Sequence, residues 1–137
     1  ARFHPGGTLG KRLFLKVSDL CVKHESPQVS VDDDVKSVIV EISQKRLGAT
    51  AVLQEDNLKG IITDGDIRRM LEDGSDIMSL KAKDIMCTNP KQIQADELAV
   101  VALKIMEKHN IMQLLVMQGV SYIGVVHLHD ILKEGII

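Results

Sequence analysis

The segments GIITDGD and GVVHLHD carry the side chains of this sequence that are best suited to holding a small polar ligand. Thr63 and Asp66 place a hydroxyl and a carboxylate three residues apart in the first segment, and His127 and Asp130 place an imidazole and a carboxylate in the second. A carboxylate can accept hydrogen bonds from two neighbouring hydroxyls, and an imidazole, which titrates near neutral pH, can donate to a phosphate. These four residues are therefore candidate ligand contacts.

Helix capping is the competing explanation for the same residues. A Thr followed three residues later by an acidic side chain fits a helix N-terminus, with Thr63 as the N-cap and Asp66 as its partner. His127 would be a poorer N-cap in a degenerate second site. Because a residue can cap a helix and also contact a ligand, the sequence leaves both roles open.

Other charged side chains lie beside the two motifs. Arg68 and Arg69 follow the first motif, where Arg69 is a candidate contact for a ligand phosphate. Either arginine could instead lie on a solvated helix face and pair with Glu72 or Asp73. His127 and His129 are two residues apart and would point in opposite directions in a strand, so we expect no metal site there.

The two motifs belong to an internal repeat with an offset of 63 to 65 residues. The paired positions are Asp19 with Asp84, Pro27 with Pro90, Val35 with Leu98, Gly60 with Gly124, and Asp66 with Asp130. Such a repeat predicts one supersecondary unit used twice. A copy of this length has a thin core, so we expect the two copies to pack sheet against sheet as one globule.

Each copy predicts the same order of elements, β-α-β-β-α. Apolar residues spaced three and four apart predict a helix from Val35 in the first copy and from Leu98 in the second. Short alternating or apolar runs predict the strands, and a short helix closes each copy. The expected strands are 28–31, 49–53, 60–63, 91–94, 113–117 and 122–126, and the closing helices are 66–71 and 130–135. The fold class is α/β (α+β).

The composition excludes several classes of function. A net charge of −2 gives no electrostatic footprint for nucleic acid, and no apolar run reaches the roughly 18 residues that a membrane span needs. Cys21 and Cys87 form no metal-binding or CxxC pattern, so we expect buried or half-buried thiols in a reduced, cytoplasmic protein. We expect the methionines to fill the core of an aromatic-poor protein, namely Met70, Met86, Met106, Met112 and Met117.

The repeated Gly-x-x-Thr-x-x-Asp pattern resembles a tandem pair of CBS domains, also called a Bateman module. The resemblance covers nearly everything from Val17 to Ile137 and implies a linker at 1–16, one domain at 17–76 and a second at 77–137. It implies two copies related by a pseudo-twofold axis. It also implies that Thr63, Asp66, His127 and Asp130 hold the phosphate and ribose hydroxyls of a nucleotide, with His127 standing in place of the usual Thr.

A closer resemblance rests on HPGGTLGKRL, TDGDIRRML and GVVHLHDILKEGII, which are similar to the C-terminal portion of D-arabinose-5-phosphate isomerases. In that family a sugar-isomerase (SIS) domain precedes the CBS pair. The resemblance implies an isomerase that interconverts D-ribulose 5-phosphate and D-arabinose 5-phosphate on the route to Kdo, a sugar of lipopolysaccharide. It assigns His4 to the isomerase active site, whose pocket these 137 residues lack, so the fragment alone is not expected to be catalytic.

The resemblance leaves the ligand and the assembly open. The fragment needs no cofactor, and its ligand could be the activated sugar CMP-Kdo, acting by feedback, or an adenine nucleotide. The alternatives are an empty pair that dimerises, for example through an apolar face from Met70 to Met78, within a tetrameric enzyme, and a related SIS–CBS isomerase with another substrate. The expected partners are further copies of the chain and a small molecule, with no nucleic acid and no membrane.

Overall fold

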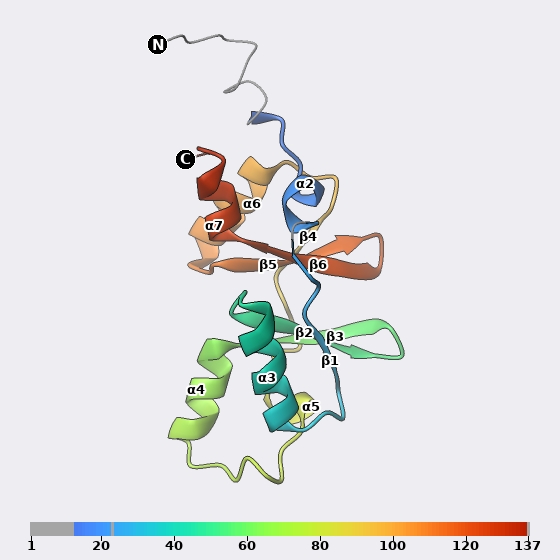
Figure 1. The fold of residues 1–137 in the computed structure, drawn as a ribbon, viewed down its shortest axis with the longest axis vertical. Helices are drawn as coiled ribbons and strands as arrows, with labels where there is room; N and C mark the ends of the chain where they lie inside the picture. Colours follow the sequence, from blue (N-terminus) through green and yellow to red (C-terminus); the bar gives the residue numbers. More distant parts are fainter. Residues whose placement is uncertain (1–12, 23, 137) are drawn as a thin grey trace.

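A computed structural model describes residues 13–22 and 24–136, which form two three-stranded sheets, each with its own helices (Figure 1). The first sheet contains β1 (Gln28–Ser30), β2 (Ala49–Gln54) and β3 (Asn57–Thr63). The second contains β4 (Gln92–Gln94), β5 (Gln113–Gln118) and β6 (Ser121–His127). The helices are α2 (Val17–Cys21), α3 (Val35–Lys45), α4 (Asp64–Glu72), α5 (Ala82–Ile85), α6 (Ala99–His109) and α7 (Leu128–Lys133).

The two sheets have the same topology, which confirms the predicted fold class. In each sheet the first strand pairs in parallel with the second, and the second pairs antiparallel with the third. Even the register irregularity is repeated, between Val52 and Leu53 in β2 and between Val116 and Met117 in β5. The chain therefore uses one backbone pattern twice.

The hairpins are tighter than the sequence predicted. The strands β2 and β3 extend to Gln54 and Asn57, which leaves only Glu55 and Asp56 in the turn. Both turn residues have positive φ, 51° and 67°, as in a type I′ turn. Gln54 and Asn57, which lie outside the predicted strands, pair with each other at the end of the hairpin and are exposed.

Residues at the two faces of the central strands explain their continuous apolar sequence. Leu114 and Val116 of β5 face the helices α6 and α7, whereas Leu115 faces the other sheet. In β2, Val52 faces α3 and Ala51 faces the second sheet. Strands covered on both faces lose the polar alternation of a half-exposed strand. The two sheets thus pack face to face, as predicted.

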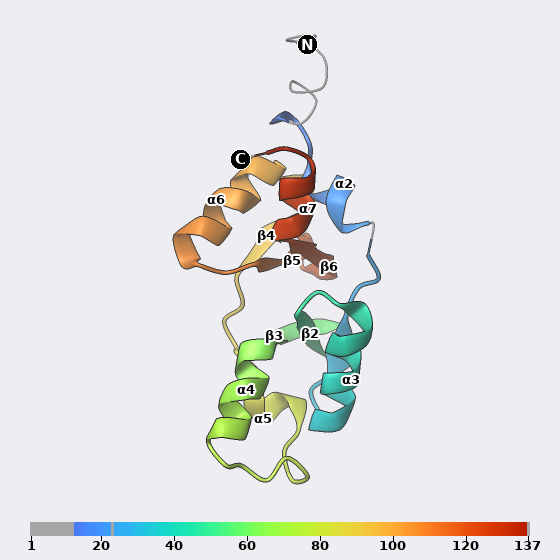
Figure 2. The same ribbon diagram turned by 60° about the vertical axis from the view of Figure 1, so that its left-hand side comes forward.

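Two short helices, which the sequence analysis did not predict, exchange partners between the copies (Figures 1 and 2). The helix α2 lies early in the chain but packs against β5 and β6 of the second sheet, and α5 packs against β3 and α4 of the first. Val17 N–H donates to the Glu97 carbonyl at 2.8 Å, and Ala82 N–H donates to the Asp33 carbonyl at 2.8 Å. Each sheet is therefore completed by the segment that precedes the other one.

A glycine permits one of these crossings. Beyond α5 the chain forms a bridge to β3, where Ile61 and Cys87 exchange two backbone hydrogen bonds of 3.0 and 2.8 Å. A Cβ added at the adjacent Gly60 would lie 2.5 Å from the Cys87 carbonyl oxygen. The motif glycine of the first copy is thus needed because backbone packs directly on it.

Candidate functional site

The first cleft lies between the two copies, where β3 ends and α4 begins. It is a cavity of about 250 Å³ with mostly apolar walls. Its lining residues are Ile61, Thr63, Asp66, Cys87, Asn89, Pro90, Lys91, Ile111 and Gln113. The first copy thus contributes the polar motif, while the rest comes from the segment before β4 and from the start of β5.

Thr63 and Asp66 form a reciprocal capping box at the start of α4. Asp66 N–H donates to Thr63 Oγ1 at 3.3 Å, and Thr63 N–H donates to Asp66 Oδ2 at 2.9 Å. The capping explanation offered for these residues is therefore correct, and it satisfies two backbone donors that the helix leaves free. Because both side chains also line the first cleft, capping does not remove them from contact with a ligand.

Arg69 neutralises the outward oxygen of the Asp66 carboxylate. Its Nη2 donates to Asp66 Oδ1 at 2.7 Å. The Arg69 side chain is 67% exposed and Asp66 18%, so the guanidinium can leave this pair at little cost and follow a ligand. Arg68 is exposed, in line with the solvated-face interpretation.

The second cleft is the counterpart of the first at the end of β6. Its cavity is larger, about 500 Å³. The lining residues are His24, Arg46, Leu47, Gly48, Asp64, Met112, Gln113, His127, His129, Asp130 and Lys133. It therefore holds His127 and Asp130, as the repeat predicted, together with several side chains that can carry positive charge.

Asp130 is buried in this cleft, and each of its carboxylate oxygens has a partner. Its Oδ2 accepts from His127 N–H at 3.0 Å, as part of a capping box like that of the first copy. Its Oδ1 lies 2.8 Å from Nε2 of His24, a residue 106 positions away. Asp130 is 8% exposed and the His24 side chain 27%. The carboxylate that would accept a ligand's hydroxyls is thus paired with a histidine of the protein itself.

His127 caps α7 through its ring. Its Nδ1 accepts from His129 N–H at 3.0 Å, and the two imidazoles stack with centroids 5.0 Å apart. The expectation that these rings point in opposite directions was wrong, because α7 begins at Leu128 and the two residues are not in an extended strand. Burial lowers the pKa of His127, and positive charge on His129 and His24 lowers it further, whereas Asp130 raises it.

The lowered pKa of His127 predicts a loss of stability in mild acid. Relative to an ordinary value of 6.5, the folded state holds the proton less well than the unfolded state. The stabilisation is therefore complete above about pH 6.5 and is lost as the pH falls through the folded-state pKa. We expect His127→Asn, which keeps an N-cap acceptor, to reduce the loss of unfolding free energy in urea titrations between about pH 7.5 and pH 5.

The matched control for this titration is Thr63→Asn, which changes the equivalent cap of the first copy and removes no imidazole. This variant should lose as much unfolding free energy in acid as the parent chain does. If the unfolding free energy falls equally steeply with decreasing pH in the parent and in His127→Asn, His127 does not contribute to the pH dependence.

Gln113 lies between the two clefts and lines both. Its amide nitrogen donates to the Leu47 carbonyl at 3.0 Å, which ties the start of β5 to the start of β2. Gly48 has a φ of +73°, and a Cβ there would lie 2.7 Å from Gln113 Nε2. A side chain at position 48 would therefore push apart the contact that separates the clefts.

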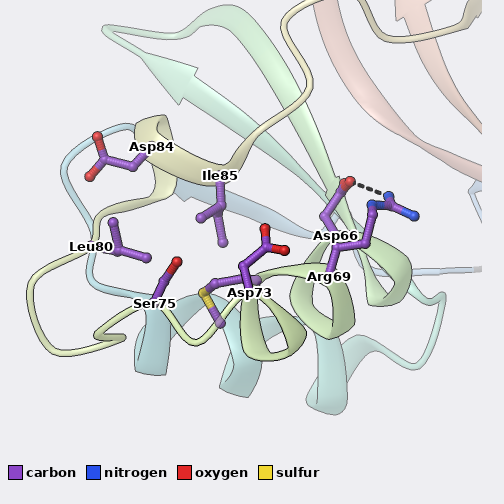
Figure 3. A pocket seen from close by; sticks show the side chains of 8 residues that line it. Asp66, Arg69, Asp73, Ser75, Leu80, Asp84 and Ile85 are labelled. Carbon is purple, nitrogen blue, oxygen red and sulfur yellow. Dashed lines mark hydrogen bonds and ion pairs between the residues drawn. The ribbon is translucent and has the colours of Figure 1, made fainter.

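A third cavity, of about 310 Å³, lies between α4 of the first copy and the segment that leads into and includes α5 (Figure 3). The Asp66–Arg69 pair lies at one end and Asp84 at the other. Its remaining lining residues are Met70, Asp73, Ser75, Leu80 and Ile85. It lies apart from both clefts except for sharing Asp66 with the first.

Some expectations about single residues need correction. Cys21 is buried as expected, but Cys87 is exposed, because its segment runs along the edge of the first cleft. Met112 is also not a core residue, since it is 46% exposed at the rim of the second cleft. Met70 is 5% exposed, so the predicted apolar face from Met70 to Met78 does not include its first member. His4 lies outside the described residues.

The sequence analysis missed several residues that line the clefts, among them His24, Gln113, Arg46, Lys133 and Lys91. Nothing in the sequence around Gln113 indicates its role, because its hydrogen-bond partner, the Leu47 carbonyl, is 66 positions away. The position of His24 did carry an indication in the sequence: seven residues, 20–26, separate the paired Asp and Pro of the first copy, whereas five, 85–89, separate those of the second.

In the described part of the chain no group of three potential ligands is arranged for a metal ion, and no helix there is long and apolar enough to cross a membrane.

Comparison with known proteins identifies the repeat. The family model of the CBS domain matches residues 17–73 and 82–136. Arabinose 5-phosphate isomerase KdsD of Yersinia pestis is 40% identical over 136 residues, 98% of this chain and 42% of that protein. The KdsD of Francisella tularensis is 42% identical over 132 residues, 95% of this chain and 40% of that protein. The chain thus spans about two fifths of the length of these relatives.

A solved structure shows the same fold. The CBS domain protein of Pyrobaculum aerophilum, complexed with AMP, superposes with a TM-score of 0.77 at 20% identity, over 85% of this chain and 89% of that one. The topology, the duplicated motifs and the family match agree. The chain belongs to the CBS domain family and contains two copies of that domain.

Proposed function

We propose that this chain is the regulatory CBS pair of a cytoplasmic D-arabinose-5-phosphate isomerase and that it binds a nucleotide between its copies. The parent enzyme would interconvert D-ribulose 5-phosphate and D-arabinose 5-phosphate. The names of the relatives matched over nearly the whole chain support the parent activity. The AMP complex of a protein with the same fold supports a nucleotide ligand.

The first cleft is the observation that carries the ligand proposal. It combines apolar walls, suited to a base, with Thr63 and Asp66 at the start of the nine-residue helix α4. A helix N-terminus favours a phosphate, and the Asp66 carboxylate can accept from ribose hydroxyls once Arg69 moves. Arg69 and Lys91 lie close enough to this region to offset the phosphate charge.

Regulation would follow from differential binding. A ligand changes the activity of the parent enzyme only if it binds one arrangement of the isomerase domains more tightly than another. CMP-Kdo would make the pair a feedback sensor of the pathway, and AMP or ATP would make it a sensor of adenine nucleotides. Both ligands contain the ribose and phosphate that the cleft is suited to hold.

A thermal-unfolding screen with AMP, ADP, ATP, CMP and CMP-Kdo tests the proposal. A ligand at 100 times its dissociation constant should add about 2.7 kcal/mol to the stability of the chain. We expect one nucleotide class to raise the midpoint and Asp66→Ala to abolish the shift measured from its own baseline. Asp19→Ala is the control, because Asp19 caps α2 in the same way from an exposed position outside the clefts.

The alternative is a structural module that joins copies of the enzyme. Leu71 and Met78, at and beyond the end of α4, are 55% and 85% exposed, and they favour it as apolar contacts for a second copy. Sedimentation separates the two ideas. If no nucleotide shifts the midpoint and dimers persist on dilution, the ligand proposal is wrong and the structural one stands.

A further inference from the structure

The two clefts differ in how their motif carboxylates are occupied. In the first cleft, the outward oxygen of Asp66 is held by Arg69, which is 67% exposed and lies on the same helix. In the second, the outward oxygen of Asp130 is held by His24, which comes from the segment that crosses from the first copy. The first pair can open without disturbing the cavity. The second occupies the cavity itself.

His24 reaches Asp130 because of the longer connection before β1. The shorter connection of the second copy lies as a bridge along β3, and there Cys87 pairs with Ile61 through its backbone. The longer connection instead contacts β6 through a side chain, because Ser26 Oγ donates to the Ile123 carbonyl at 2.6 Å. Ser26 is thereby held against β6, and His24, two residues earlier, lines the second cleft.

The remaining charges of the second cleft suit an anion. Arg46 and Lys133 line the cavity with the three histidines, against the carboxylates of Asp64 and Asp130. A nucleoside phosphate would thus find positive charge for its phosphate, but its ribose hydroxyls would meet a carboxylate whose Oδ1 already pairs with His24. The Asp130 oxygen keeps a second lone pair, but the His24 ring lies against that oxygen and lines the cavity, so a ribose placed against Asp130 must displace the ring.

We infer that His24 is an intrinsic latch on the second cleft, which competes with ribose hydroxyls for Asp130 and makes this cleft the weaker of two nucleotide sites. The inference rests on the proposed nucleotide binding. It assigns the difference between the clefts to one residue of the crossing segment rather than to the replacement of Thr by His127. Removing the His24 ring should therefore open the second cleft without affecting the first.

The test is a titration of the chain with AMP and with CMP-Kdo, followed by calorimetry and by the backbone amide signals of both motifs. We expect His24→Ala to tighten binding at the second cleft about tenfold, as reported by the amides of His129 and Asp130. Binding at the first cleft, reported by Gly65 and Asp66, should stay unchanged. His24→Ser, which can hold a water against the carboxylate, serves if the alanine variant does not fold.

His129→Ala is the matched control, because it removes another imidazole from the same cleft without touching Asp130. It should not tighten binding. If the first cleft binds a nucleotide and affinity at the second is unchanged or lower in both His24 variants, the latch is wrong while the proposed function stands. If none of the five nucleotides of the thermal screen binds any of these proteins, both the latch and the proposed nucleotide binding are wrong, because an opened second cleft is expected to bind.

Discussion

Truncation of Leu20 to alanine is expected to lower the free energy of unfolding by about 3 kcal/mol, the usual cost of removing a buried leucine side chain. Leu20 is 1% exposed, and its neighbours in the core belong to the second sheet and its helices, not to the sheet that follows it in sequence. The cavity would open under α2, whose five residues have few other apolar anchors. The damage should therefore appear first in the second copy.

Urea unfolding gives the loss of stability, and hydrogen exchange gives its location. We expect the amides of β5 and β6 to lose more protection than those of β2 and β3. Val22→Ala is the control, because Val22 follows the same helix but is 74% exposed, and its truncation should change the free energy little. Greater loss of protection in the first sheet would show that α2 does not stabilise the second one.

The exchange of α2 and α5 is the part of the fold that the sequence could not predict. Strands and long helices have periodic apolar patterns, and the repeat confirmed each pattern a second time. A helix of four or five residues, such as α5, is too short to show a period, and nothing in its sequence says which sheet it covers. The partner is chosen by tertiary packing, where Val17 and Ala82 fill equivalent gaps on opposite sheets.

The sequence predicted only the part of the candidate site that the two copies share. The motif residues of both copies do line the clefts, since an element repeated in sequence is placed equivalently by a repeated fold. His24 was not predicted because it acts on a residue 106 positions away. A sequence repeat reveals what two copies share, whereas His24 lies in a segment where they differ.

Leu115→Ala should also lower the free energy of unfolding by about 3 kcal/mol, but the loss of protection from hydrogen exchange should be distributed differently over the two sheets. Leu115 is fully buried between the sheets, in a cluster with Leu47, Ala51 and Val125. Its counterpart in the repeat is Ala51, so a large side chain on one sheet packs in the same cluster as a small one on the other. Because this cluster belongs to both sheets, we expect amides of both to lose protection to similar extents, unlike in Leu20→Ala.

Exchanging the large and the small side chain at positions 115 and 51 tests whether close packing between the sheets holds the two copies together. Ala51→Leu alone should destabilise the chain, since it adds three carbon atoms at a fully buried position in the same cluster as Leu115. Combined with Leu115→Ala it should recover part of the loss, which a double-mutant cycle would report as a favourable coupling energy. Leu132→Ala, truncating a side chain that is 46% exposed on α7, is the control for a lost leucine outside this layer. Strictly additive losses in the cycle would mean that the two side chains do not share one cavity.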